Sequence, residues 1–218
     1  MVVRFTMENG NVQRELRLSG SGARLLSIGQ EIRIELVRKS IHLLIGLVPL
    51  LASYNLSLTY FMLAVGTLVY ATSETLRMGG VEVPLISRVT ALAARQRDSG
   101  HFVLGPVTLG IGTMLSLLLY PEPAASIAIY SLAFGDGLSS LVGKLFGSIR
   151  LPFTGGKSLE GSLTCFFAVF ISAYSLTQRA PESLGVALVG TLVEAAPLKD
   201  FDNIVLPMAA GLASLLLL

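Results

Sequence analysis

The chain has 218 residues, of which 52% are hydrophobic and 14% are charged, with a formal net charge of +2. Soluble domains carry about a quarter charged residues, so this composition and the mean hydropathy of +0.71 exclude an ordinary soluble protein and predict an all-α integral membrane protein. The arginines are spread along the chain rather than gathered into a basic stripe, which argues against a nucleic-acid-binding domain.

The first 30 residues are polar and mixed in charge, and they contain no apolar segment of the kind that a cleavable signal peptide needs. We expect residues 1–30 to form a cytoplasmic tail, with a short strand at residues 13–18. Residues 31–218 then form one polytopic membrane domain. The single cysteine, Cys165, lies in an apolar run and cannot form an internal disulfide.

The apolar runs predict about seven transmembrane helices and one interfacial helix. The seven spans are expected at about 41–53, 56–72, 102–120, 124–142, 159–177, 184–196 and 203–218. The first is extended by an amphipathic segment at 28–40, and Pro106 is expected to kink the third. Residues 84–97 carry an apolar stripe beside three arginines, which predicts an amphipathic helix lying on the membrane surface.

With seven spans, the basic residues fall almost entirely on one side of the membrane. Arg179 alone lies on the other side. By the positive-inside rule, the side rich in lysine and arginine is cytoplasmic, with the N-terminus inside and the C-terminus outside. Most of the polar residues that are costly in a membrane lie near the cytoplasmic ends of spans, and this is the side where nucleotides are available.

The stretch 133–163 contains the residues with the clearest chemical potential. Asp136 closes an apolar run between Gly135 and Gly137, where the helix can bend or unwind and expose its backbone to a ligand. Lys144 and Lys157 follow in a glycine-rich loop. A carboxylate, lysines and exposed backbone amides are the groups that bind a nucleotide phosphate and its magnesium ion. The alternatives are a helix end at the headgroups for Asp136 and ordinary loop lysines for the other two.

The segment Gly155-Gly156-Lys157-Ser158 precedes a predicted helix, whose first amides and dipole favour an anion. It is not a Walker A loop, because Leu151 stands where that motif needs glycine. Glu160 lies three residues after Lys157 and shares its helix face. It can pair with that lysine, bind a metal or act as a base.

Two further groups of residues have a functional and a structural interpretation. Arg38 and His42 share one helix face, where the cation can hold a phosphate while the imidazole moves a proton, although a single histidine is more often structural. Glu194 and Asp202 can complete a metal site, or Asp202 can cap the last helix. Glu74 is either a span terminus or a metal-shell carboxylate.

Four of these motifs, in this order, resemble one family. They are ELVRKSIH at 35–42, FGDG at 134–137 with GKLFG at 143–147, KSLEGS at 157–162, and VE at 193–194 followed by Asp202, Asn203 and Pro207. The resemblance, over about residues 31–218, is to the CTP-dependent lipid kinases, which include dolichol kinase, phytol kinase and the CTP-dependent diacylglycerol kinase.

The resemblance implies that a lipid hydroxyl attacks the γ-phosphorus of CTP with the help of Mg²⁺. The residues to which it assigns catalysis are Arg38, His42, Asp136, Lys144, Lys157 and Glu160. Nucleotide binding is assigned to Lys39, Gly135, Gly137, Gly143, Lys144, Gly156, Lys157 and Ser158. The metal would be held by Asp136 with one of Glu160, Glu194 or Asp202.

Two other functions stay open as alternatives. One is a phosphatidate cytidylyltransferase, although residues 153–158 lack the Ser-Pro of that related family. The other is a small transporter, although the charges gather at one face instead of crossing the membrane. The acceptor, diacylglycerol or a polyprenol or phytol-type alcohol, is not specified by these residues. At this length we expect a prokaryotic inner-membrane protein.

Overall fold

In the computed structural model, which describes residues 32–93 and 100–218, every named element is helical and no strand is present in these two ranges. This confirms the all-α prediction. The tail, its expected strand at 13–18 and the residues 94–97 of the interfacial helix lie outside the described residues.

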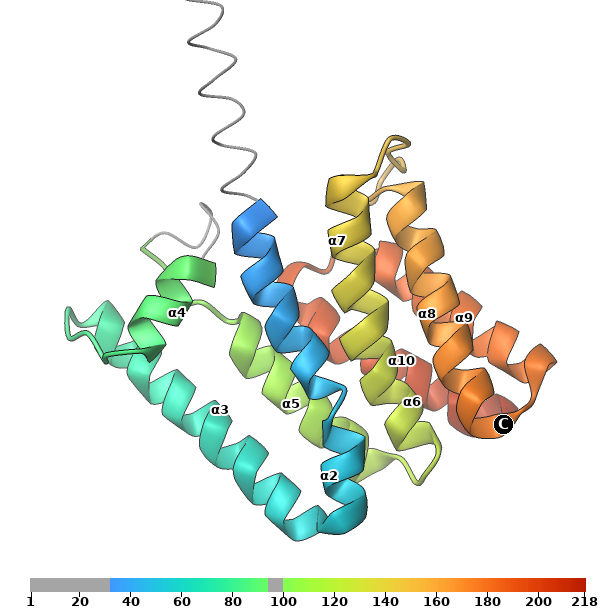
Figure 1. The fold of residues 1–218 in the computed structure, drawn as a ribbon, viewed down its shortest axis with the longest axis horizontal. Coiled ribbons are helices and arrows are strands. Elements are labelled where there is room, and N and C mark those ends of the chain that lie inside the picture. The colour runs from blue at the N-terminus through green and yellow to red at the C-terminus, as the bar shows by residue number, and fades with distance from the viewer. Residues whose placement is uncertain (1–31, 94–99) are drawn as a thin grey trace, which may run out of the picture.

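The N-terminal half of the described chain contains a helix over residues 32–45, then α2 (Val48–Tyr54), α3 (Leu56–Met78), α4 (Ile86–Ala93) and α5 (Gly105–Leu119). The C-terminal half contains α6 (Ala124–Tyr130), η2 (Ser131–Asp136), α7 (Gly137–Leu145), α8 (Leu159–Thr177), α9 (Ala180–Ala195), η3 (Lys199–Phe201) and α10 (Asp202–Leu217). Figure 1 shows α3, α4 and α5 on one side of the helix 32–45, with α7 and α8 on the other.

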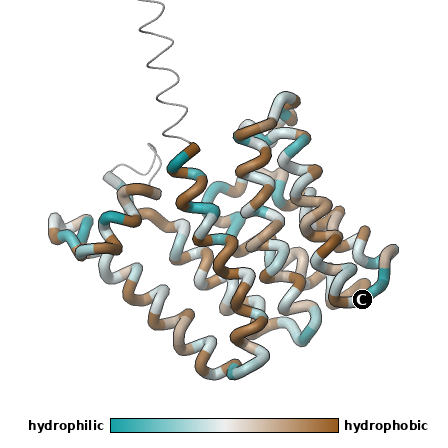
Figure 2. Tube along the Cα trace, in the orientation of Figure 1, coloured by the Kyte–Doolittle hydropathy of each residue, from teal (hydrophilic) through white to brown (hydrophobic). Residues whose placement is uncertain are grey.

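Four segments are long and apolar enough to cross a membrane: Leu56–Met78, Ala124–Leu145, Leu159–Thr177 and Lys199–Leu217. The fifth predicted span, 159–177, coincides with α8. The segments α5 and α9 are shorter, with 15 and 16 residues. The number of spans therefore stays a prediction, whereas the integral-membrane character is supported by four apolar helices. Figure 2 shows hydrophobic residues along much of α3, and 11% of an apolar 18-residue stretch of this helix is buried within the protein.

The C-terminal helices build the packed core. Its buried residues come from α6, α8, α9 and α10 and are Ile127, Cys165, Val169, Ala173, Val186, Ala187, Ala210 and Ala213. Small side chains let these helices approach closely, which is how helices associate where lipid provides no hydrophobic driving force. Gly143 and Gly161 serve the same purpose between α7 and α8, since a Cβ on Gly161 would lie 3.3 Å from the Cα of Gly143.

The helix 32–45 turns its polar face to the protein interior. Glu35, Lys39 and His42, spaced by about one helical turn, are buried, while Leu36 is exposed. A helix against lipid gains by placing its apolar face outward and its charged face against partners inside the protein. The predicted first span, 41–53, is interrupted at Gly46, where a Cβ would lie 2.9 Å from the Phe134 ring.

The expected kink at Pro106 is wrong. Pro106 occupies the first turn of α5, which begins at Gly105, so its missing amide hydrogen breaks no bond of the helix. The proline inside a helix is Pro207 of α10. The predicted unwinding at Asp136 is also not observed, because the helix continues from α6 into α7 through the π-helical turn η2.

Glu74 links α3 to the segment before α5 and is a structural carboxylate. Its Oε1 accepts a hydrogen bond from the Val103 amide at 2.8 Å, and Arg77 donates to both of its oxygens. The side chain of Glu74 is 1% exposed, and Glu74 lines none of the three cavities described below. The alternative role in a metal shell therefore has no support from its position.

We predict that Glu74→Ala lowers the stability by about 1–3 kcal/mol, because the buried Val103 amide loses its acceptor. For a chain of this size, this corresponds to a melting temperature about 2–4 °C lower per kcal/mol. Thermal unfolding of the protein in detergent measures this change in melting temperature. The control is Thr75→Ala, since the exposed Thr75 hydroxyl bonds only its own helix at Ala71. Equal melting temperatures for both variants would contradict the structural role.

Candidate active site

Asp136 lies at the end of the π-helical turn η2 and is held by the helix 32–45. Its Oδ2 lies 2.5 Å from Lys39 Nζ and 3.2 Å from His42 Nδ1, and the side chains of Asp136 and Lys39 are 3% and 4% exposed. A widened π turn commonly marks a functional site. Gly135, beside it, packs against α8, where a Cβ would lie 3.1 Å from Val169. A buried, paired carboxylate is therefore presented to the space between α7, α10 and the helix 32–45.

Lys157 and Glu194 form a second ion pair. Lys157 Nζ lies 2.8 Å from Glu194 Oε1 and also bonds the Glu194 carbonyl oxygen. Ser139 and Ser162 donate to the two carboxylate oxygens of Glu194 at 3.2 and 3.3 Å. The pair fixes the loop between α7 and α8 to the end of α9, so the lysine predicted from sequence is held in one place.

Lys144 and Glu160 have separate surroundings. Lys144 Nζ lies 2.9 Å from the buried Glu35 carboxylate of the helix 32–45. Glu160 Oε1 accepts hydrogen bonds from the amides of Ser148 and Ile149, at 2.8 and 3.3 Å. The expected pairing of Glu160 with Lys157 is therefore not what the structure has, because the amides of the preceding loop are nearer partners.

Two polar cavities lie beside these ion pairs and share Ser140, Gly155 and Lys157 in their linings. The first, of about 300 Å³, is lined by both Asp136 and Asp202 together with Arg38, Lys39 and His42. The second, of about 250 Å³, is lined by Lys144, Arg150 and Lys157 around Gly156 and Gly161. We name them the carboxylate cavity and the basic cavity. Positive φ angles at Gly155 and Gly156, +71° and +98°, shape the loop that borders both.

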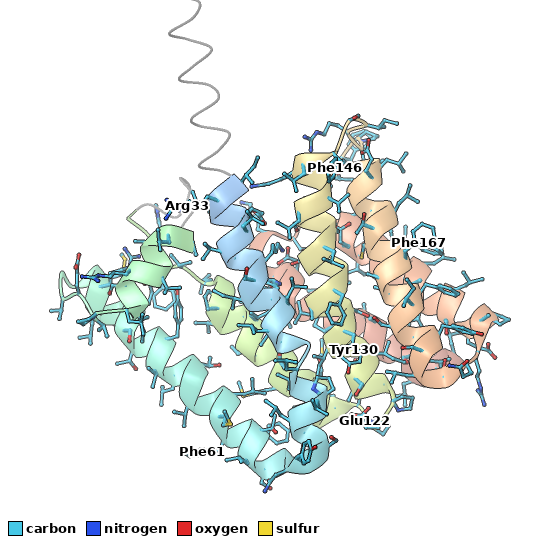
Figure 3. All side chains as sticks on the ribbon, viewed as in Figure 1. Arg33, Phe61, Glu122, Tyr130, Phe146 and Phe167 are labelled. Atoms are coloured by element: carbon cyan, nitrogen blue, oxygen red, sulfur yellow. The ribbon has the colours of Figure 1, made fainter. Side chains whose placement is uncertain are left out.

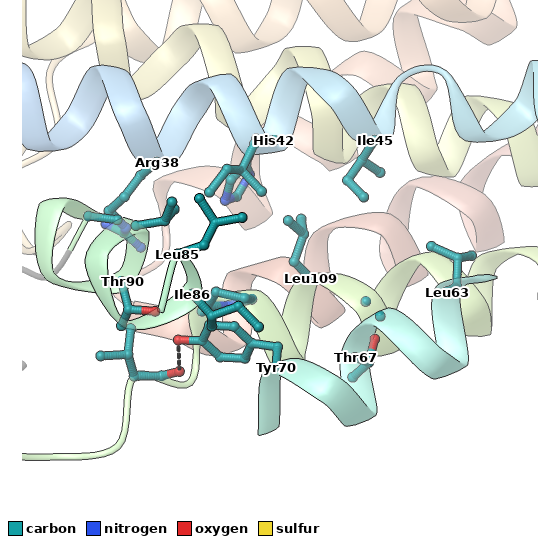
Figure 4. Close-up of a pocket in the computed structure, with 18 of the residues that line it drawn as sticks. Arg38, His42, Ile45, Leu63, Thr67, Tyr70, Leu85, Ile86, Thr90 and Leu109 are labelled. Atoms are coloured by element: carbon teal, nitrogen blue, oxygen red, sulfur yellow. Dashed lines mark hydrogen bonds between the residues drawn. The ribbon is translucent and has the colours of Figure 1, made fainter. Parts of the chain in front are cut away.

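A third cavity, of about 450 Å³, is mostly apolar and lies between the helix 32–45, α3, α4 and α5. Figure 4 shows Ile45 and Leu63 at one end, Arg38 and Thr90 at the other, and Leu109 between them. The apolar stripe predicted for the interfacial helix contributes Leu85, Ile86, Val89 and Ala93 to its wall. Tyr70 donates to the Val103 carbonyl oxygen at 3.2 Å and closes the wall between α3 and α5.

Arg38 and His42 line both the apolar cavity and the carboxylate cavity. An elongated apolar molecule with a polar end can therefore place that end beside Asp136 while its chain stays among α3, α4 and α5. Arg38 is held within 3.9 Å of Asp200, before α10. The two residues that the sequence placed on one helix face thus lie at the junction of an apolar and a charged site.

Comparison with curated proteins gives matches along most of the chain. It is 28% identical to phytol kinase 1, chloroplastic, of Arabidopsis thaliana over 209 residues, which cover 85% of this chain and 67% of that protein. It is 25% identical to farnesol kinase, chloroplastic, of the same plant over 205 residues (84% and 66%), and 28% identical to dolichol kinase of Mus musculus over 135 residues (52% and 25%). These similarities support the family of lipid-alcohol kinases that the motifs of the chain resemble.

The chain spans about two thirds of the length of the two Arabidopsis kinases and a quarter of mouse dolichol kinase. No protein-family model matches it, and no solved structure gives a significant match. The names of the plant relatives place those proteins in chloroplasts, which gives no support to the expected prokaryotic inner membrane. Which membrane holds this protein, and in which orientation, stays a prediction.

The glycines and the serine predicted to bind nucleotide divide into two groups in this fold. Gly143, Gly156 and Ser158 line the basic cavity. Gly135 and Gly137 line neither polar cavity and pack instead against α8 and the helix 32–45. Ser158 also caps α8, since its Oγ accepts from the Gly161 amide.

Sequence reasoning left out several residues that the fold brings to the site. Glu35 begins the ELVRKSIH segment and pairs with Lys144, and Arg150 lines the basic cavity. Ser140 and Thr154 line the carboxylate cavity. Glu35 lies four residues before Lys39 on the same helix face, and this spacing could have identified it as a residue of the site. No comparable pattern marks serines and threonines as site residues, because most of the serines and threonines in the described residues bond their own helix.

The carboxylates predicted to bind Mg²⁺ are only partly brought together. Asp136 and Asp202 line one cavity and interact electrostatically, whereas Glu194 lines the basic cavity and Glu160 lines neither. Within residues 32–93 and 100–218, no group of three His, Cys, Asp or Glu side chains forms a ready metal site. Magnesium usually needs only one or two carboxylates, with phosphate oxygens and water completing its shell. Asp136 and Asp202 fit that requirement.

Proposed function

We propose that the chain is a lipid kinase that transfers the γ-phosphate of CTP to the hydroxyl group of an isoprenoid-type membrane alcohol. The observation that carries this proposal is the junction at Arg38 and His42 between an apolar cavity and a cavity containing paired charges. The names of the related phytol, farnesol and dolichol kinases support the same class of acceptor.

In this proposal the apolar cavity holds the first part of the lipid chain, so the hydroxyl lies at Arg38 and His42. The nucleotide occupies the carboxylate and basic cavities, and its phosphates are bound by Lys157 and Lys144. Phosphoryl transfer depends mainly on positioning and on neutralising charge. Both requirements are served by lysines that buried carboxylates already hold in place.

Asp136 and Asp202 would hold Mg²⁺, which when bound neutralises phosphate charge during transfer. The loop glycines Gly155 and Gly156 let the backbone approach the phosphates closely. Glu194 then acts through Lys157, which it orients at 2.8 Å. Glu160 supports the loop through the amides of Ser148 and Ile149.

His42 is placed to handle the proton of the acceptor alcohol. Its Nδ1 is buried 3.2 Å from Asp136 Oδ2 and makes no hydrogen bond within the described residues, so the imidazole lies beside the carboxylate with a ring nitrogen available to accept the proton of the alcohol. The O–H bond of the alcohol breaks as the alcohol oxygen forms a bond to the γ-phosphorus of CTP. The bond between the γ-phosphorus and the bridging oxygen breaks as well, and CDP leaves.

A product assay tests the proposal. Purified protein in mixed micelles receives magnesium, a lipid acceptor, and CTP labelled at either the α- or the γ-phosphate. The acceptors are phytol, a polyprenol, diacylglycerol and phosphatidate, and γ-labelled ATP is offered in parallel. We expect label from the γ-position of CTP on an isoprenoid alcohol. Transfer of the α-label to phosphatidate would instead indicate a cytidylyltransferase, and transfer only from ATP would contradict the donor.

A further inference from the structure

Gly66 stands on the wall of the apolar cavity where nothing in the packing requires a glycine. It lies inside α3, and a Cβ built on it meets no atom of the described residues within 4 Å. Glycine within a helix costs about 1 kcal/mol relative to alanine. Gly66 is exposed and lines the cavity, so its missing side chain leaves space at the open side of the cavity rather than permitting a helix contact.

At the neighbouring contact between α3 and α5, in contrast to Gly66, the packing requires a glycine. A Cβ on Gly110 would lie 2.1 Å from Thr67 Oγ1, so at this point the two helices touch and a side chain cannot be added. Thr67 and Gly110 both line the cavity. The helices therefore meet beside Gly66, while Gly66 itself borders open space. Figure 4 shows Thr67 and Leu63 at the end of the cavity away from Arg38.

The position of Gly66 along α3 gives it a defined depth. The lining residues of α3 run from Tyr70 to Met62, which is eight residues or about 12 Å at 1.5 Å per residue. An extended chain advances about 1.2 Å per bond, since three backbone bonds span about 3.6 Å. The cavity thus accommodates roughly ten bonds of a lipid chain, and Gly66 lies about halfway, four residues from Tyr70.

We propose that Gly66 determines how much of the acceptor's chain the protein encloses. An isoprene unit contributes four bonds to the main chain, so the cavity encloses between two and three units next to the hydroxyl and leaves the rest of a longer chain to the bilayer. A large side chain at position 66 would halve that length. This inference rests on the proposed function, because it assigns the apolar cavity to the acceptor.

The test compares isoprenoid alcohols of 10, 15 and 20 carbons at equal mole fraction in mixed micelles, with kcat/KM measured for each. For the unaltered protein we expect similar values for the 15- and 20-carbon alcohols and a value about tenfold lower for the 10-carbon alcohol. For Gly66→Leu the shortened cavity encloses about five bonds of each alcohol, so we expect the two longer alcohols to lose at least tenfold more than the 10-carbon alcohol and the three values to become similar. Each buried CH₂ is worth about a factor of four in affinity, which makes a tenfold loss conservative.

Ala64→Leu is the matched control, because it adds the same side chain to an exposed position of α3 that does not line the cavity. It should leave the ratio between acceptors unchanged. Equal loss on all three alcohols in Gly66→Leu, or no loss on any, would overturn the role of Gly66. A melting temperature of Gly66→Leu well below that of Ala64→Leu would also overturn it, since the space would not be open.

A binding measurement separates this inference from the kinase proposal. Equilibrium binding of the radiolabelled 15-carbon alcohol requires no nucleotide, and Gly66→Leu should weaken it at least tenfold relative to Ala64→Leu. Binding that shows this difference without phosphate transfer from any nucleotide would uphold the role of Gly66 and contradict the kinase. Transfer to all three alcohols that is insensitive to Gly66→Leu would uphold the kinase and contradict the role of Gly66.

Discussion

Asp136→Asn is expected to lower kcat/KM for phosphate transfer at least 100-fold. The substitution keeps the size of the side chain but removes the charge that pairs with Lys39 at 2.5 Å and faces His42 at 3.2 Å. Under the proposed function it also removes one of the two carboxylates available to magnesium in the carboxylate cavity. Transfer of label from γ-labelled CTP to phytol measures the effect.

Two controls distinguish lost chemistry from lost folding. Glu122→Gln removes a carboxylate that lines none of the three cavities and lies at the lower edge of the molecule in Figure 3, so it should leave the rate unchanged. Removing one partner of a buried pair costs about 3–5 kcal/mol, so the double variant Lys39→Met, Asp136→Leu should restore much of the stability without the activity. A loss of less than tenfold in a folded Asp136→Asn protein would contradict the metal assignment.

Lys157→Met is expected to lower kcat/KM for CTP at least 100-fold, with a clear rise in KM for the nucleotide. Lys157 is shared by the two polar cavities and is the cation held by Glu194 at 2.8 Å. Methionine has a similar length without the charge, so the phosphates lose a fixed cation and Glu194 keeps only its serine partners. Initial rates at varied CTP and at saturating acceptor separate the two constants.

Arg33→Met is the matched control for Lys157→Met. Arg33 is an exposed cation near the start of the helix 32–45 and lines none of the three cavities, so its removal should change KM for CTP less than twofold. Lys157→Arg should recover only part of the activity, because a planar guanidinium does not replace a compact ammonium in a site built around it. An unchanged KM for CTP in Lys157→Met would place the nucleotide elsewhere.

Local patterns were sufficient for several elements. The 159–177 span was predicted with the bounds of α8, because Ser158 and Glu160 provide a recognisable helix start before a long apolar run. Pro106 was misjudged for a local reason as well: its effect depends on where the helix begins, and the start at Gly105 makes it harmless. Whether a proline kinks a helix or begins it depends on the first residue of that helix, which the sequence does not give.

The pairing of charges was not predictable in the same way. Lys157 and Glu160 were expected to share a helix face, yet Lys157 precedes α8 and pairs with Glu194, 37 residues away, while Glu160 accepts from loop amides. Asp136 and Lys39 are 97 residues apart. Buried charges select partners by the crossing of helices, and Gly143 and Gly161, which permit the close approach of α7 and α8, give no sign of their contact in the sequence.

The helical, membrane-embedded character and the resemblance of four motifs to those of lipid kinases could be read from the residues alone, because composition, apolar runs and motif order are properties of the chain. The tertiary structure alone decided which carboxylate faces which cation and where an apolar cavity meets the charged one at Arg38 and His42. These features depend on residues far apart in the chain whose distances are set by helix packing.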